Sequence, residues 1–145
     1  YMPCNQLQKV EDFDVFLKRN LEIIKVEAFS MSTEEISAAR EILKEIPGIS
    51  YLSSFEDNVE VTDRGAQKGY ILEKVIRLKG LSKEQVMVIG DGMNDLTLFE
   101  CFPVSYAPAN ARDRIKKLAM EVVADSEEDG FARAVDRMLE SSGAV

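Results

Sequence analysis

Two carboxylates, an amide and two glycines fall within six consecutive positions, Gly90-Asp91-Gly92-Met93-Asn94-Asp95. The loop follows the apolar run Val86–Ile89, which predicts a buried strand. Glycines allow tight turning and close approach of the backbone to a ligand, and two carboxylates four residues apart can face one small cation. A strand end followed by a helix cap would explain one polar residue, but not the whole set. The loop therefore predicts a magnesium and phosphate site.

The rest of the composition favours magnesium over zinc. The chain has no histidine, and its two cysteines, Cys4 and Cys101, lie far apart in the sequence. Nitrogen and sulfur are the ligands that zinc prefers, whereas magnesium prefers oxygen. We therefore expect Mg²⁺ as the cofactor and no disulfide framework.

Lys68 is the second residue whose position suggests chemistry. It stands in the opening turn of a helix predicted over residues 66–79, where the helix dipole disfavours a cation. An anion nearby would compensate, and a lysine can neutralise phosphoryl oxygens as a point charge. A solvated surface lysine is the alternative, but its placement one strand before the Asp91 loop favours the phosphate role.

Asn110 follows a strand predicted near residues 104–106 and precedes a helix predicted over 112–118. It is a candidate phosphate or substrate contact in the same cleft. Capping of the next helix is an equally good explanation of an asparagine at this position.

The elements that must position these residues alternate between strand and helix. A helix over 66–79 is followed by strands near 86–89, 104–106 and 122–124, with helices near 94–100, 112–118 and 131–139. This alternation predicts an α/β fold with a Rossmann-like, three-layer parallel sheet over residues 63–145. Residues 1–62 are predicted to form a separate α+β lobe. Its elements are helices over 11–20 and 32–46, and strands over 23–29, 49–53 and 59–62, the last two pairing as a hairpin.

Charge and hydropathy argue against nucleic acid and a membrane as binding partners. The 18 basic and 26 acidic residues give a net charge of −8 in 145 residues, which disfavours binding to nucleic acid. The short cationic run at Arg112, Arg114, Lys116 and Lys117 is interpreted as a solvated helix surface. Apolar runs are too short to cross a bilayer, so we expect no membrane partner and a cytoplasmic location.

The motifs together resemble those of the haloacid dehalogenase-like hydrolases, in particular the Cof-type sugar phosphatases with a large α/β cap (type C2B). The matching segments are Glu60-Val61-Thr62 with Gly65-Ala66-Gln67-Lys68-Gly69, Val88-Ile89-Gly90-Asp91-Gly92-Met93-Asn94-Asp95, Ala109-Asn110-Ala111 and Glu128-Asp129-Gly130-Phe131. They span residues 59–139 in the family's order. Two departures from the family pattern are minor. Gln67 stands where this branch often has serine, and Pro103 and Pro108 flank a strand that is usually followed by a methionine-containing stretch.

The resemblance implies roles for the candidate residues. Lys68 would be the catalytic lysine that holds the transferring phosphoryl group, and Asp91 would bind Mg²⁺. Asp95 would be a metal ligand or its support, and Asn94 a substrate contact. The implied substrates are small phosphorylated metabolites such as sugar phosphates. Residues 1–62 would be the carboxyl-terminal part of the cap, and residues 63–145 the carboxyl-terminal half of the core.

The family's aspartate nucleophile has no counterpart here. Asp12-Phe13-Asp14 is the nearest Asp-x-Asp motif, but it follows no apolar strand. We therefore expect a carboxyl-terminal half that is inactive alone and belongs to a phosphatase of about twice its length. A noncatalytic anion-binding or regulatory pseudo-enzyme module is the alternative. A missing central strand would also leave strand edges unpaired, which favours self-association.

Overall fold

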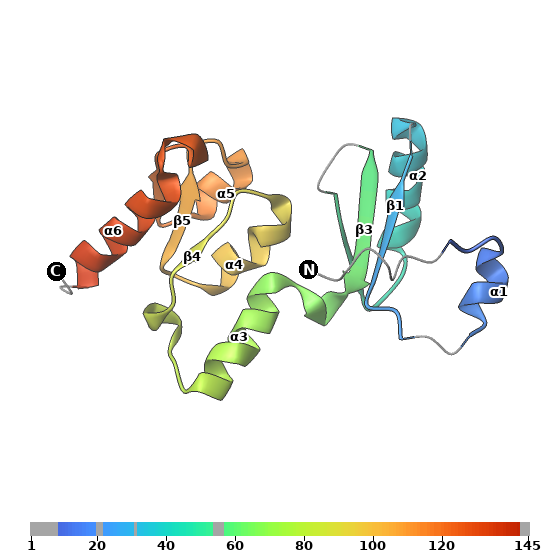
Figure 1. Cartoon of the computed structure of the whole chain (residues 1–145), viewed down its shortest axis with the longest axis horizontal. Coiled ribbons are helices and arrows are strands. Elements are labelled where there is room, and N and C mark those ends of the chain that lie inside the picture. The colour runs from blue at the N-terminus through green and yellow to red at the C-terminus, as the bar shows by residue number, and fades with distance from the viewer. Residues whose placement is uncertain (1–8, 20–21, 31, 54–56, 143–145) are drawn as a thin grey trace.

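The computed structural model describes residues 9–19, 22–30, 32–53 and 57–142 (Figure 1). Cys4, and Glu56 of the predicted hairpin turn, lie outside the described residues. The described part contains two sheets, each with its own helices, and the segment after β3 leads into α3 between them.

The first sheet is antiparallel. Its elements are α1 (Phe13–Leu17), β1 (Lys25–Phe29), α2 (Thr33–Lys44), β2 (Ile49–Leu52) and β3 (Asn58–Asp63). β2 and β3 pair as the predicted hairpin, with Tyr51 opposite Val61. β1 pairs with the other side of β3, with Glu27 opposite Glu60, which gives the strand order β1-β3-β2. The pairing of β1 was not predicted, because the residues that it joins lie 29 to 37 positions apart in the sequence.

The two helices of this lobe differ in how the fold uses them. α2 begins where the sequence predicts, with the Ser32 hydroxyl accepting a hydrogen bond from the Glu35 N–H group at 3.3 Å and Ile36 buried. α1 is only five residues long, shorter than the predicted 11–20 helix, and none of its residues is buried. Phe13 and Leu17 stay exposed, so no tertiary packing extends this short helix.

The second sheet is parallel, with the strand order β4-β5-β6. Its elements are α3 (Lys68–Lys79), β4 (Val88–Ile89), α4 (Leu96–Cys101), β5 (Ser105–Pro108), α5 (Asp113–Leu118), β6 (Glu121–Val123) and α6 (Gly130–Ser142). Short 3-10 turns, η2 (Arg64–Ala66), η3 (Lys83–Gln85), η4 (Met93–Asp95) and η5 (Ser126–Glu128), precede or connect them. The predicted parallel α/β arrangement is confirmed, although β4 is shorter than the predicted strand at 86–89.

Side chains of β5 pack into the core on both faces of this sheet. Ala107 packs with Phe99 of α4 and Ile115 of α5, whereas its neighbour Tyr106 packs with Val123 and with Ala134 of α6. Successive strand residues point to opposite faces. Helices therefore cover both faces of the parallel sheet, and the loops that follow β4, β5 and β6 emerge at one edge. Within the described residues, no helix has the length and apolar character needed to cross a membrane.

Candidate active site

The Asp91 loop begins where β4 ends, and Asp95 organises it. Its carboxylate is buried, and Oδ2 accepts hydrogen bonds from the N–H groups of Asp91 and Gly92, each at 3.2 Å. The same loop forms the turn η4 before α4 begins at Leu96. Asp95 therefore folds the loop back on itself and leaves the Asp91 side chain exposed at its surface.

The glycines of the loop are required by close contacts. A Cβ on Gly90 would lie 2.6–2.7 Å from atoms of the Asp95 side chain, and one on Gly92 would lie 2.8 Å from Oδ1 of Asn94. Such distances are too short for carbon, so a larger residue would displace Asp95 or Asn94. The close approach seen here is to the loop's own side chains, and the predicted close approach to a ligand stays a prediction.

Lys68 lies in the opening turn of α3, as predicted, although the helix begins at Lys68 itself and not at residue 66. Its ammonium group lies 2.5 Å from Oδ1 of Asp95. The lysine side chain is 52% exposed and the aspartate side chain 8% exposed. Asp95 therefore supplies an anion beside Lys68 within the chain, and the phosphate role of Lys68 stays a prediction. Because half of the lysine side chain remains open to solvent, it is also accessible to a ligand.

Close packing between α3 and α4 fixes the position of Lys68. The N–H group of Gly69 donates to Oγ1 of Thr97 at 3.0 Å, and a Cβ on Gly69 would lie 2.2 Å from the Thr97 carbonyl oxygen. Only glycine allows the two helices to approach this closely. The start of α3 is therefore held against the Asp91 loop and the start of α4 by packing as well as by the Lys68–Asp95 ion pair.

A pocket of about 280 Å³ opens beside the loop. It is lined by residues 91–94 together with Ser53, Asn110 and Arg112. The pocket brings together three of the residues predicted from the sequence, Asp91, Asn94 and Asn110. Asp95 lies beneath the loop, and Lys68 reaches it from α3.

Asn110 does not cap α5, so that explanation of the residue was wrong. Its Nδ2 donates to Oγ of Ser126 at 2.9 Å, and its Oδ1 accepts from the Ser126 N–H group at 3.3 Å. The N-cap position of α5 is Arg112. Asn110 thus ties the loop after β5 to the loop after β6, and its role as a phosphate contact stays a prediction.

The oxygen-rich donor set suits a hard cation. Asp91 offers an exposed carboxylate, whereas both oxygens of Asp95 already have partners. Among the described residues, no group of three or more His, Cys, Asp or Glu side chains gathers to hold a metal. Mg²⁺ commonly keeps several waters and takes only one or two protein carboxylates. The residues present fit Mg²⁺ with Asp91 as the accessible carboxylate.

The Asp-x-Asp sequence near the start of the chain has a structural role. Oδ1 of Asp12 accepts a hydrogen bond from the Val15 N–H group at 2.9 Å and so caps α1. This segment lies in the lobe of the antiparallel sheet, and among the described residues no strand of the parallel sheet precedes it. Asp12 and Asp14 are therefore not the nucleophile motif of this site.

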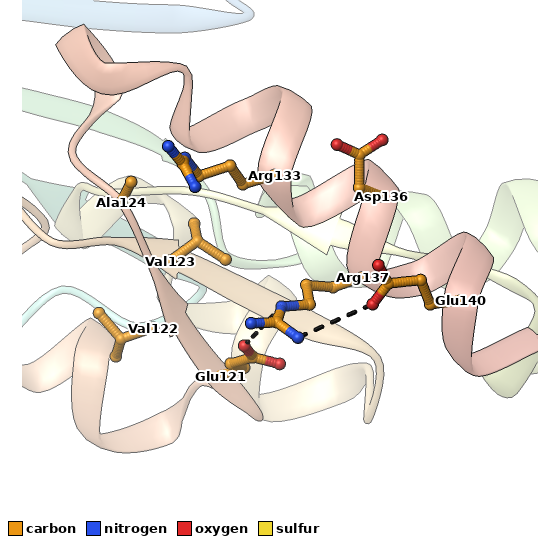
Figure 2. Close-up of a pocket in the computed structure, with 8 residues that line it drawn as sticks. All are labelled: Glu121, Val122, Val123, Ala124, Arg133, Asp136, Arg137 and Glu140. Atoms are coloured by element: carbon orange, nitrogen blue, oxygen red, sulfur yellow. Dashed lines mark ion pairs between the residues drawn. The ribbon is translucent and has the colours of Figure 1, made fainter.

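A second pocket, of about 400 Å³, lies between β6 and α6 (Figure 2). Three of its charged side chains meet in two ion pairs. Arg137 lies between Glu121, at 3.5 Å, and Glu140, at 3.7 Å, and the Arg133 Nε donates to the Glu128 carbonyl at 3.4 Å. Because its cations are engaged within the chain and none of the predicted site residues lines it, this pocket is not the candidate site.

Comparison with known proteins identifies the family. The model of the haloacid dehalogenase-like hydrolases matches residues 5–135. This chain belongs to the haloacid dehalogenase-like hydrolases. It is 30% identical over 117 residues to 5-amino-6-(5-phospho-D-ribitylamino)uracil phosphatase YwtE of Bacillus subtilis, a match covering 81% of this chain and 41% of that protein.

Solved structures of haloacid dehalogenase-like hydrolases share the fold. One from B. subtilis superposes with a TM-score of 0.76 at 26% identity, covering 85% of this chain and 44% of that one. The subclass IIB sugar phosphatase BT4131 gives a TM-score of 0.71 at 28% identity, covering 87% and 45%. These matches confirm the Cof-type branch. The chain spans less than half the length of each of these three proteins.

Two residues of the pocket, Ser53 and Arg112, were not predicted from the sequence as site residues. Ser53 follows β2 in the other lobe, and only the fold brings it near Asp91. Arg112 was grouped with a solvated cationic helix surface; it is exposed, as expected, and it also lines the pocket. Its position directly after Asn110-Ala111, at the end of a predicted strand, was the available signal.

Proposed function

We propose that this chain forms the magnesium- and phosphate-binding half of a phosphatase that hydrolyses small phosphorylated metabolites such as sugar phosphates. Residues 63–145 are the carboxyl-terminal half of its Rossmann-like core, which lacks the nucleophile strand. Residues 1–62 are the carboxyl-terminal part of its cap. The family relationship and the sugar phosphatase among the similar structures support this proposal.

One observation carries the proposal: the exposed Asp91 carboxylate and the partly exposed Lys68 ammonium are both positioned by Asp95. Asp91 binds Mg²⁺, which supplies charge neutralisation and polarisation of the phosphoryl oxygens when bound. Lys68 holds a phosphoryl oxygen as a second positive charge. Asn94 and Asn110 orient the substrate, and Asp95 supports the loop and the lysine.

The test is the Mg²⁺-dependent hydrolysis of an aryl phosphate and of sugar phosphates. The chain alone should show no turnover, because none of its described residues supplies the nucleophile. The whole product of its gene should show turnover, and Asp91→Ala should lower that turnover by about 100-fold or more. Undiminished turnover in the Asp91→Ala variant would refute the site.

A noncatalytic anion-binding module remains the second candidate, because Asp12 caps α1 instead of following a strand of the parallel sheet. Binding of phosphate by the whole gene product without any hydrolysis would favour this candidate. Hydrolysis of any phosphomonoester that depends on Asp91 would exclude it.

A further inference from the structure

Arg112 is fixed beside the Asp91 loop by a backbone contact. Its N–H group donates to the carbonyl oxygen of Asp91 at 3.0 Å, which ties the start of α5 to the loop after β4. Arg112 lines the pocket together with Asp91 and Asn94, and it is exposed to solvent. The ends of β4 and β5 therefore hold Arg112 at the pocket, beside Asp91, the proposed metal ligand.

The guanidinium of Arg112 is uncommitted. Among the residues that the structure describes, no carboxylate forms an ion pair with it and no side-chain hydrogen bond engages it. Two other cations of this lobe are paired, unlike Arg112: Lys116 pairs with Asp113 at 3.1 Å, and Arg137 lies between two glutamates. In a chain with a net charge of −8, an arginine left unpaired in a pocket beside an aspartate calls for an anionic partner.

The proposed phosphoryl site uses two positive charges, Mg²⁺ at Asp91 and the Lys68 ammonium, and has no role for a third one at Arg112. Lys68 comes from α3 and is not one of the residues that line the pocket, so it approaches the loop from another element. A guanidinium presents several N–H donors in a planar fork that matches a carboxylate or a phosphate. The pocket volume of about 280 Å³ is at the lower limit for small-molecule sites, so the ligand is small.

We propose that Arg112 determines substrate specificity by pairing with a second anionic group, a carboxylate or a further phosphate, on the leaving group of the substrate. This inference rests on the proposed function, in which Lys68 and the Asp91 loop hold the phosphoryl group that is transferred. The preferred substrates are then small phosphomonoesters that carry a second negative charge a few bonds from the ester oxygen.

Two ligands of nearly equal size isolate the second charge: 3-phosphoglycerate has a carboxylate where glycerol 3-phosphate has a hydroxymethyl group. Each is titrated into the ¹⁵N-labelled 145-residue chain with Mg²⁺ present, and dissociation constants come from amide shifts. We expect about tenfold tighter binding of 3-phosphoglycerate, as for one charge-assisted bidentate contact. Arg112→Ala should remove this preference, and Arg112→Lys should retain only part of it.

Arg114→Ala is the matched control, because it removes the same charge two positions away, in the first turn of α5, and Arg114 does not line the pocket. It should keep the preference for 3-phosphoglycerate. Equal affinity of the two ligands for the unaltered chain would overturn the proposal, as would a preference that survives Arg112→Ala or one that Arg114→Ala removes equally well.

Lys68→Ala separates this proposal from the proposed function. It should weaken both ligands alike and leave their ratio unchanged. If Lys68→Ala changes neither affinity, the phosphate site is refuted. If the two ligands bind equally and Lys68→Ala weakens both, only the role of Arg112 is refuted. Absence of binding by either ligand would overturn both proposals.

Discussion

The ammonium of Lys68 and Oδ1 of Asp95 lie 2.5 Å apart, although 27 positions separate them in the sequence. The other oxygen of the same carboxylate holds the N–H groups of Asp91 and Gly92. One buried carboxylate thus positions both the cation proposed to hold phosphate and the loop that presents the proposed metal ligand. Asp95 joins the start of α3 to the end of β4.

Asp95→Asn tests whether the Asp95 carboxylate holds Lys68 and the Asp91 loop in place. The amide loses the charge-assisted bond to Lys68 and weakens the two backbone bonds in the loop. We expect the free energy of unfolding, measured by urea denaturation, to fall by about 1–3 kcal/mol. Asp113→Asn removes the same charge from an aspartate–lysine pair whose aspartate is 87% exposed, and should cost about 0.5 kcal/mol or less. Equal losses in the two variants would contradict the role of Asp95.

Gly69→Ala tests the close approach of α3 and α4. The added methyl would lie 2.2 Å from the carbonyl oxygen of Thr97, so the helices would have to separate. We expect a loss of about 1–3 kcal/mol of unfolding free energy, as for overpacking of a core, and weaker phosphate binding because Lys68 is the preceding residue. Gly65→Ala is the control, since its methyl would meet only a carboxylate oxygen of Asp63, at 3.1 Å. Similar stability of the two variants would argue against the packing.

The local sequence was sufficient to place the loop, and the topology supplied the rest of the site. Asp91, Asn94 and Lys68 stand at strand and helix ends that periodicity alone predicts. The Lys68–Asp95 contact and the approach of Ser53 depend on tertiary packing between distant segments, which no local pattern encodes. Arg112 is exposed, as the interpretation of its cationic run predicts, but its place at the pocket depends on the approach of the loop after β4, which the run does not encode.

β4 pairs only with β5 in the described sheet, so its other edge is unpaired. The N–H groups of Val88 and Gly90 bond to Val104 and Tyr106, and those of Met87 and Ile89 therefore point to the open edge. We expect the chain to self-associate at micromolar concentration, measured by light scattering. Met87→Pro should reduce the association more than Met87→Ala, because only proline removes the donor. A monomer at all concentrations would refute this expectation.

Glu73 and Lys83 form an ion pair that links α3 to η3. The hydrogen bond from Lys83 lowers the pKa of the Glu73 carboxyl below its ordinary value. Because the folded-state pKa is depressed, the stabilisation is present above the unfolded-state pKa and is lost as the pH falls through the folded value. Lys83→Gln should raise the pKa of Glu73, measured by NMR titration of its side-chain carboxyl. An unchanged pKa in that variant would show that the pair does not form in solution.

Mg²⁺-dependent binding of inorganic phosphate to the 145-residue chain tests the central claim most directly. Calorimetric titration should show phosphate affinity that rises about tenfold when Mg²⁺ is added. Asp91→Asn should abolish that increase, whereas Lys68→Gln should weaken phosphate binding both with and without Mg²⁺. If Asp91→Asn keeps the full Mg²⁺ effect, the loop after β4 is not the metal and phosphate site.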